Sequence, residues 1–224
     1  MKIKLYHGSP IVVEKPLYGY GRSYNDYGLG FYCTEHIELA KEWACSNNCD
    51  GYVNEYELEL SGLKILNLNY GKYNILNWLA ILVENRFFNF TTALQNSAKD
   101  YLLNNFLPNY NDYDLIIGYR ADDSYFLFAR SFLSNQISLK QLGQAMKLGK
   151  LGEQYCIKSK KAFSKIKFLN ATLAESEKYY QLKIKRDSGA KRDYKSILKI
   201  EDIDGVFMRD IIKEEWKNDD PRLR

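Results

Sequence analysis

Apolar and polar residues alternate in several short stretches of the chain, as they do in half-buried β-strands. This pattern predicts strands over residues 2–7, 30–34, 51–62, 63–69, 113–120, 152–159 and 164–174. Other stretches repeat apolar residues at helical spacing and predict helices over residues 35–48, 74–88, 98–107, 124–136, 138–149, 175–186 and 203–216. Thr34 is the expected N-cap of the first helix. Because strands and helices mix without regular β-α-β alternation, the sequence predicts an α+β fold.

The chain has no visible internal repeat or clean linker, and its 224 residues suit one domain with an extension. We expect residues 1–173 to form the main domain and residues 174–224 to form a helical C-terminal extension packed on it. The last apolar-acidic segment, "DIDGVFMRDIIKEEW", packs on the body of the protein in this interpretation. A docking surface or an intramolecular lid are the alternatives for it.

Charge is distributed unevenly although the net charge is only +4. Between Lys158 and Lys199 there are 13 Lys and Arg against four Asp and Glu. Such a block is typical of a solvated helix face, or of a surface that meets nucleic acid or an acidic protein.

The cysteines and the apolar runs limit the possible environment of the protein. Its four cysteines form no disulfide pattern, and "CSNNC" with His36 nearby lacks a second ligand pair, so we expect no metal. No apolar run approaches the ~18–20 residues of a membrane helix. We therefore expect a cytoplasmic protein with no membrane partner.

Three separated stretches contain the candidate site residues. "LYHGSP" places His7, one of two histidines, at the end of the first predicted strand, directly before Gly8 and Ser9. "GLGFYCT" contains Tyr32, and "GEQYCIKS" contains Gln154 within a later predicted strand. An imidazole and a carboxamide can both hydrogen-bond a ligand hydroxyl, and an aromatic ring can stack on a planar ligand.

In this order and spacing, the stretches resemble the ADP-ribosyltransferase superfamily, on the diphtheria-toxin and poly(ADP-ribose) polymerase side with its His-Tyr-Glu triad. "YHGS" resembles the first strand of that family and "GLGFYCT" its Gly-x-Gly-Ile-Tyr-Phe stretch, which puts His7 and Tyr32 in the His and Tyr positions. "GEQYCIKS" resembles the strand of the catalytic Glu, a position that Gln154 occupies here. The chain is similar, from about residue 3 to about residue 170, to a toxin-like bacterial branch that shares "DYGLGFY", an Ala-Asp-Asp stretch and a Gly-x-Gln-Tyr strand.

The resemblance implies a split β-sheet core with flanking helices, and NAD as a co-substrate. It implies a mono-ADP-ribosyltransferase that modifies a protein or nucleic acid and releases nicotinamide. It further implies a toxin of a toxin–antitoxin or defence system, with a small antitoxin protein as a possible partner. His7 would hydrogen-bond the ribose, while Tyr32 and Trp43 would hold the nicotinamide ring between them. A structural histidine and a core tryptophan are the alternatives for His7 and Trp43.

Further residues follow from the same resemblance. Gly8 and Ser9 would lie against the nicotinamide, and Arg22, in the following loop, would contact the pyrophosphate. Gln154 can hydrogen-bond but supplies no negative charge, so another acid is expected to assist. Asp123 in "ADDSY" is that candidate, and a helix N-cap is its alternative role.

The sequence leaves two other functions open. The missing Glu also fits a catalytically inactive module that binds NAD or ADP-ribose. The Lys-rich block also fits a basic nucleic-acid-binding interaction protein.

Overall fold

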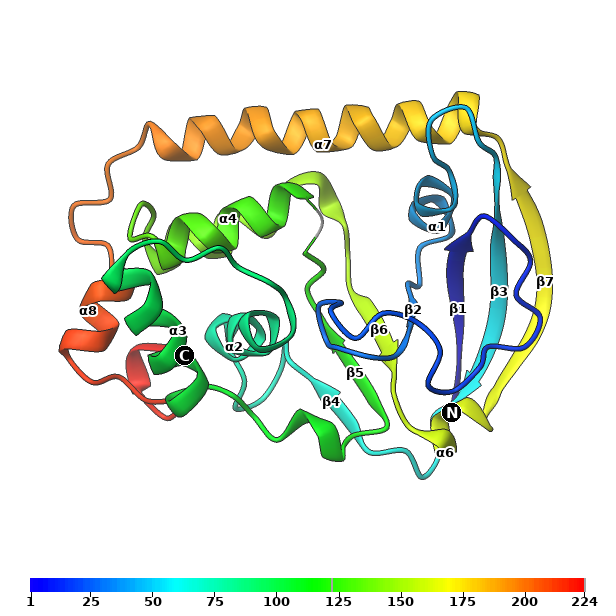
Figure 1. Cartoon of the computed structure of the whole chain (residues 1–224), viewed down its shortest axis with the longest axis horizontal. Helices are drawn as coiled ribbons and strands as arrows, with labels where there is room; N and C mark the ends of the chain where they lie inside the picture. The colour runs from blue at the N-terminus through cyan, green and yellow to red at the C-terminus, as the bar shows by residue number, and fades with distance from the viewer. Residues whose placement is uncertain (122, 224) are drawn as a thin grey trace.

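The computed structural model contains two small β-sheets flanked by helices (Figure 1), and it describes residues 1–121 and 123–223 except for the side chain of residue 123. Within the described residues, one sheet has the order β1-β3-β7 and the other has the order β2-β6-β5-β4. The strands are β1 (Lys2–Ser9), β2 (Phe31–Cys33), β3 (Gly51–Glu59), β4 (Ile65–Asn67), β5 (Leu115–Gly118), β6 (Gln154–Ile157) and β7 (Ile166–Ala174). The predicted α+β class is therefore confirmed.

A short backbone bridge joins the two sheets near the ends of β1 and β2. Tyr6 and Thr34 exchange two backbone hydrogen bonds, with N···O distances of 2.7 and 2.9 Å. Within the second sheet, β2 pairs with β6 so that Tyr32 faces Cys156, two residues beyond Gln154. These pairings bring the three sequence stretches with the candidate residues into one region.

Helices flank the two sheets. They are α1 (Ile37–Ala44), α2 (Ile75–Asn85), α3 (Ala93–Asn105), α4 (Asp123–Leu133), α5 (Leu139–Ala145), α6 (Lys160–Phe163), α7 (Ser176–Leu198) and α8 (Met208–Lys213), with 3-10 turns at Tyr110–Asp112, Leu148–Lys150 and Pro221–Leu223. The larger apolar core contains Trp78, Phe128 and Phe132 from α2 and α4. A smaller core contains Leu5 and Leu58 of the first sheet and Ile157 of the second.

Two predicted helix features are wrong. The first helix begins at Ile37 with His36 as its N-cap residue, whereas Thr34 is buried in the bridge between the sheets. The helix expected over residues 175–186 continues to Leu198, through Gly189. It continues because Ala190 and Tyr194 bury against the larger core, and such packing outweighs the low helix propensity of glycine.

The segment after β7 packs along one side of the molecule. Helix α7 runs across the top of the view in Figure 1, from the first sheet to α8. Met208, Ile211 and Trp216 of the last segment are buried in the larger core. The boundary at residue 173 stays a prediction. None of the helices in the described part of the chain combines the length and the apolar character that a bilayer span requires.

Candidate functional site

A cleft of about 570 Å³ opens where β1 ends, beneath the loop that follows it. Its volume lies in the range of ligand pockets, roughly 300–1,000 Å³. Its walls include every residue that the sequence assigned to NAD binding: His7, Gly8, Ser9, Arg22, Tyr32, Trp43 and Gln154. The fold therefore gathers residues from β1, β2, α1 and β6 around one cavity.

The backbone of β2, in the second sheet, fixes the orientation of the His7 imidazole. Its Nδ1 donates a hydrogen bond of 2.7 Å to the carbonyl oxygen of Tyr32, and its ring packs against Phe31 with centroids 4.4 Å apart. Burial lowers the pKa of His7 below the ordinary value of 6.5, and the carbonyl contact opposes this only in part. The ring is therefore neutral at pH 7, and its Nε2 is a hydrogen-bond acceptor.

The Tyr32 hydroxyl is engaged within the protein. It donates to the carbonyl oxygen of Gly28 at 2.5 Å and accepts from the backbone N–H of Tyr27 at 3.1 Å. Burial raises the pKa of Tyr32 far above 10.0. Tyr32 therefore offers the cleft its aromatic ring, and its hydroxyl holds the loop that closes the cleft.

Gln154 presents a buried amide oxygen that lacks a hydrogen-bond partner. The residue opens β6 opposite Gly118, and only 6% of its surface is exposed. Among the described residues nothing donates a hydrogen bond to its Oε1. A buried acceptor left unpaired costs roughly 1–3 kcal/mol, so its position in a cleft indicates that a ligand donor completes it. The neighbouring Glu153 instead accepts a hydrogen bond of 2.6 Å from Asn69.

Gly8, Ser9 and Arg22 line the cleft in different ways. A Cβ on Gly8 would lie 2.1 Å from the carbonyl oxygen of Ala40, so the glycine lets α1 pack against β1. The Ser9 hydroxyl is used in a local turn, where it donates to the carbonyl oxygen of Ile11 at 2.8 Å. Arg22 is exposed, with its guanidinium 5.9 Å from the ring centroid of Tyr24.

Trp43 is part of the cleft wall and also packs against the larger core. The guanidinium of Arg120 lies over its ring, 3.4 Å from the centroid. A cation–π contact of this kind contributes about 0.5–2 kcal/mol. Because both groups line the cleft, a planar ligand that stacks on this face of Trp43 has to displace Arg120.

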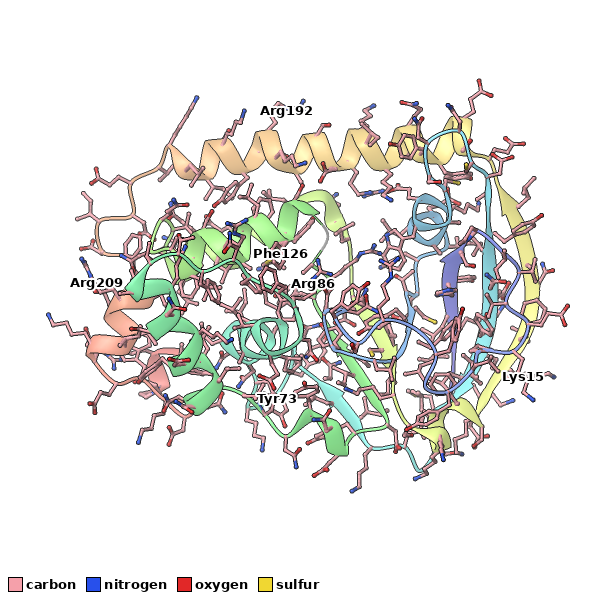
Figure 2. The ribbon with its side chains drawn as sticks, viewed as in Figure 1. Lys15, Tyr73, Arg86, Phe126, Arg192 and Arg209 are labelled. Carbon is pink, nitrogen blue, oxygen red and sulfur yellow. The ribbon has the colours of Figure 1, made fainter. Side chains whose placement is uncertain are left out.

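Sequence reasoning missed a buried carboxylate in the cleft wall. Asp26 is 5% exposed and accepts a hydrogen bond of 2.8 Å from the backbone N–H of Ala121. It also forms an ion pair of 3.2 Å with Arg86, which follows α2 and is partly exposed (Figure 2). The Asp26 charge acts on β6, where it adds to the effect of burial in raising the pKa of the Cys156 thiol to about 12.

The sequence held only a weak signal for these groups. Asp26 lies in a loop rich in tyrosine and glycine, and its partner Arg86 is distant along the chain. Arg120 closes the predicted strand over residues 113–120, at a strand end where functional loops often begin. Asp123, the acid that the sequence did single out, begins α4, but its side chain lies outside the described part of the structure.

Metal binding finds no support in the described side chains. Among them, no three His, Cys, Asp or Glu residues are grouped so as to hold an ion. Of the two cysteines in "CSNNC", Cys45 is buried and its thiol donates to the carbonyl oxygen of Ala174 at 3.2 Å, whereas Cys49 is exposed.

Comparisons with known proteins give one finding. The family model described as "Protein of unknown function (DUF3990)" matches residues 3–168, a range that includes all the cleft residues named above and ends within β7. No curated protein matches the chain, and no solved structure matches it. The matched range covers most of the 224 residues, and the chain therefore belongs to the DUF3990 family.

Proposed function

We propose that this protein is an NAD-dependent mono-ADP-ribosyltransferase that modifies a macromolecule and releases nicotinamide. The observation that carries the proposal is the unpaired, buried Oε1 of Gln154 in the same cleft as His7, Tyr32 and Trp43. These are the positions that the resemblance to the ADP-ribosyltransferases assigned to NAD. Under this proposal the two sheets correspond to the split β-sheet core of that superfamily.

The cleft residues fit such a dinucleotide. The unpaired Gln154 Oε1 would accept a hydrogen bond from one ribose hydroxyl, and the unprotonated Nε2 of His7 would accept one from another. The rings of Tyr32 and Trp43 would stack on the pyridine ring. Arg22 at the exposed rim would pair with phosphate oxygens, which suit a guanidinium.

The chemistry requires a ribosyl group that gains positive charge as nicotinamide leaves. Such a transition state resembles that of glycoside hydrolysis, in which a nearby carboxylate stabilises the oxocarbenium ion. Gln154 supplies no such charge, but Asp26 places a buried carboxylate in the wall of the same cleft. We propose that Asp26 takes over this electrostatic role. The rigid contacts that hold His7 and Tyr32 orient the reacting groups in advance.

The biological setting is part of the same proposal. A cytoplasmic transferase of this kind would act as a toxin in a toxin–antitoxin or defence system. The producing cell would then need a small antitoxin protein to restrain it. Co-purification of the full-length protein with the product of a neighbouring gene, and loss of nicotinamide release in that complex, would support this setting.

A binding module without activity is the second candidate, and the uncharged amide of Gln154 favours it. The two candidates differ in one product. The transferase releases nicotinamide from NAD and leaves ADP-ribose on an acceptor, whereas the binding module takes up NAD and leaves it intact.

The test uses full-length protein with NAD labelled in its adenylate part, incubated with bacterial lysate, and measures label in protein and in nucleic acid. Free nicotinamide is measured in parallel. Wild type is expected to transfer label and Gln154→Ala to lose transfer, while Gln181→Ala, which removes an exposed glutamine from α7, serves as the matched control. Calorimetric NAD binding without nicotinamide release would support the binding module, and no NAD binding at all would contradict both candidates.

A further inference from the structure

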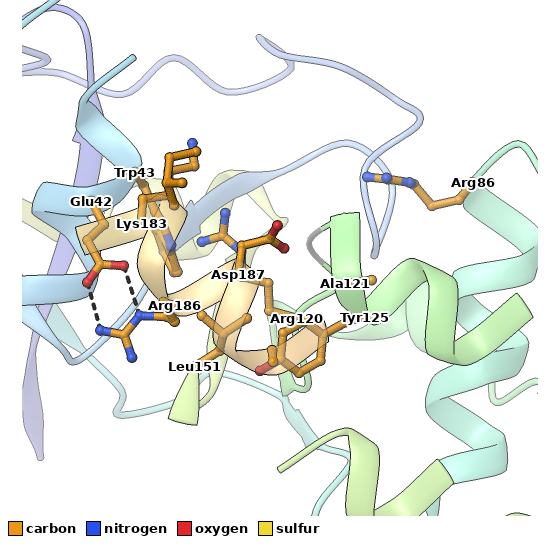
Figure 3. A pocket seen from close by; sticks show the side chains of 12 residues that line it. Glu42, Trp43, Arg86, Arg120, Ala121, Tyr125, Leu151, Lys183, Arg186 and Asp187 are labelled. Atoms are coloured by element: carbon orange, nitrogen blue, oxygen red, sulfur yellow. Dashed lines mark hydrogen bonds and ion pairs between the residues drawn. The ribbon is translucent and has the colours of Figure 1, made fainter. Parts of the chain in front are cut away.

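A second cavity, of about 280 Å³, lies next to the cleft (Figure 3). Trp43, Arg86, Arg120 and Ala121 line both, so the two share a wall. The other side of the second cavity is formed largely by α7, which follows the range that matches the DUF3990 family. The cavity thus extends the cleft toward a part of the chain with no role in the proposed NAD site.

An ion pair fixes α7 at this place. Arg186 donates two hydrogen bonds to the carboxylate of Glu42 in α1, at 2.9 and 2.7 Å (Figure 3). It donates a third to the carbonyl oxygen of Gly149 at 2.6 Å. Glu42 is only 2% exposed. Because a bidentate pair has a defined geometry, α7 is held rigidly over the cavity.

The carboxylates of the cavity are already engaged by the protein. Glu42 is neutralised by Arg186, and Asp187 pairs with Lys191 at 2.7 Å and accepts a hydrogen bond from Ser124. The cations of the lining are Arg86, which pairs with Asp26, Arg120, which lies over Trp43, and Lys183. Lys183 forms no salt bridge within 4.0 Å among the described residues.

Lys183 faces the protein rather than solvent. It lies seven residues before Ala190 and eleven before Tyr194, both of which are buried, and these spacings return to one face of a helix. Lys185 and Arg192 lie on the other side of α7, where Arg192 points away from the body of the molecule (Figure 2). A half-buried ammonium in a cavity that two guanidinium groups also line is suited to phosphate oxygens.

We propose that this cavity binds a phosphate of a single-stranded nucleic acid, which is the acceptor of the proposed transferase. The inference rests on that proposed function, because it names the acceptor. Helix α7 carries seven Lys and Arg against three Asp and Glu, and such a surface attracts a polyanion. A single strand is favoured because its bases reach an enclosed reactive centre without first leaving a duplex.

The experiment measures binding of short fluorescein-labelled single strands of DNA and RNA to the full-length protein by fluorescence anisotropy, over a series of salt concentrations. Lys183→Gln is expected to weaken binding about tenfold, as for a lost charge-assisted contact, and to lower the salt slope by about 0.7. Lys183→Arg, which keeps the charge, is expected to bind like wild type. Lys185→Gln removes the same charge from the exposed side of α7 and is the matched control, with a loss of about twofold or less.

Several results would overturn the inference. One is that wild type shows no salt-dependent binding of the strands. Another is that Lys183→Gln and Lys185→Gln lose the same strand affinity. A third is an equal loss of ADP-ribose affinity in Lys183→Gln, which would assign the cavity to the dinucleotide. Binding of polyglutamate in place of nucleic acid would assign it to an acidic protein.

Failure of the proposed function is recognised separately, from nicotinamide release by wild type alone. If wild type releases no nicotinamide while strand binding still depends on Lys183, the phosphate site stands and the transferase does not.

Discussion

Nδ1 of His7 lies 2.7 Å from the carbonyl oxygen of Tyr32, so the first sheet and the second sheet are joined through two residues of the proposed NAD site. A carbonyl oxygen only accepts hydrogen bonds, and the proton of the neutral ring is therefore on Nδ1. Nε2 is left as an acceptor at the cleft. The contact sets the tautomer that the proposed chemistry requires, and it does so before any ligand is bound.

This contact and the burial of His7 predict a pH profile. Because burial lowers the pKa of His7, the loss of nicotinamide release on acidification should have its midpoint below pH 6.5, as the ring gains a proton. The folded-state pKa lies below the unfolded value, so the stability due to neutral His7 is complete above pH 6.5 and is lost as the pH falls through the folded pKa. Initial rates across this range test it, and His36→Ala should give the wild-type profile. An inflection at or above 6.5 that His7 controls would contradict the prediction.

Gln154 is predicted to act in the chemical step. Gln154→Ala should lower the rate of nicotinamide release about 10²-fold, as the loss of a positioned hydrogen-bonding group does in other active sites. The melting temperature should not fall, because the Oε1 that is removed has no partner in the protein. A parallel fall in melting temperature and rate would show instead that Gln154 supports the fold.

Trp43 is predicted to bind NAD through its ring. Trp43→Leu should raise KM for NAD roughly three- to tenfold, which corresponds to an aromatic stacking contribution of about 0.5–1.5 kcal/mol. Steady-state kinetics of nicotinamide release measure it. Trp216→Leu, in the C-terminal segment, controls for general loss of a buried tryptophan. An unchanged KM in Trp43→Leu would leave Trp43 as a core residue.

Asp26 is predicted to stabilise the positive charge of the transition state. Asp26→Asn keeps an acceptor for the backbone N–H of Ala121 but removes the charge, and it should lower kcat at least tenfold with little change in KM. Its melting temperature should also fall, because Arg86 loses its ion-pair partner.

A second substitution separates these two effects of Asp26. Adding Gln154→Glu returns a carboxylate to the cleft and should restore the rate of Asp26→Asn without restoring its melting temperature. If rate and stability recover together, or if neither recovers, the electrostatic role of Asp26 is wrong.

The Glu42–Arg186 pair is predicted to contribute more to the free energy of unfolding than an exposed ion pair does. Glu42→Gln leaves Arg186 without its buried partner and should destabilise the protein by about 1.5–3 kcal/mol. The exposed pair of Lys2 and Glu57 offers the comparison, since Glu57→Gln should leave the stability nearly unchanged. Urea denaturation of both variants measures the difference, and equal losses would show that the buried pair adds nothing.

The sequence predicted the local elements better than the contacts between them. Alternating apolar residues identified β1 and β3, and the apolar run over residues 74–88 identified α2, in which residues 76–83 are all buried. The resemblance to ADP-ribosyltransferases selected the residues from four distant segments that line one cleft.

The errors and omissions come from tertiary structure. Thr34 looked like a helix cap because its residue type suits that role, but its backbone pairs with Tyr6. Asp26 could not be identified because its partners Arg86 and Ala121 are brought to it only by the fold. Lys183 was one cation among many in the sequence, and only the packing of α7 distinguishes it from Lys185.

A crystal structure of the full-length protein with NAD tests whether one cleft holds NAD for cleavage. We expect electron density for the nicotinamide ring between Tyr32 and Trp43, with Arg120 displaced from Trp43 and ribose hydroxyls within hydrogen-bond distance of His7 Nε2 and Gln154 Oε1. NAD bound elsewhere, or a cleft that stays empty at saturating NAD, would contradict it.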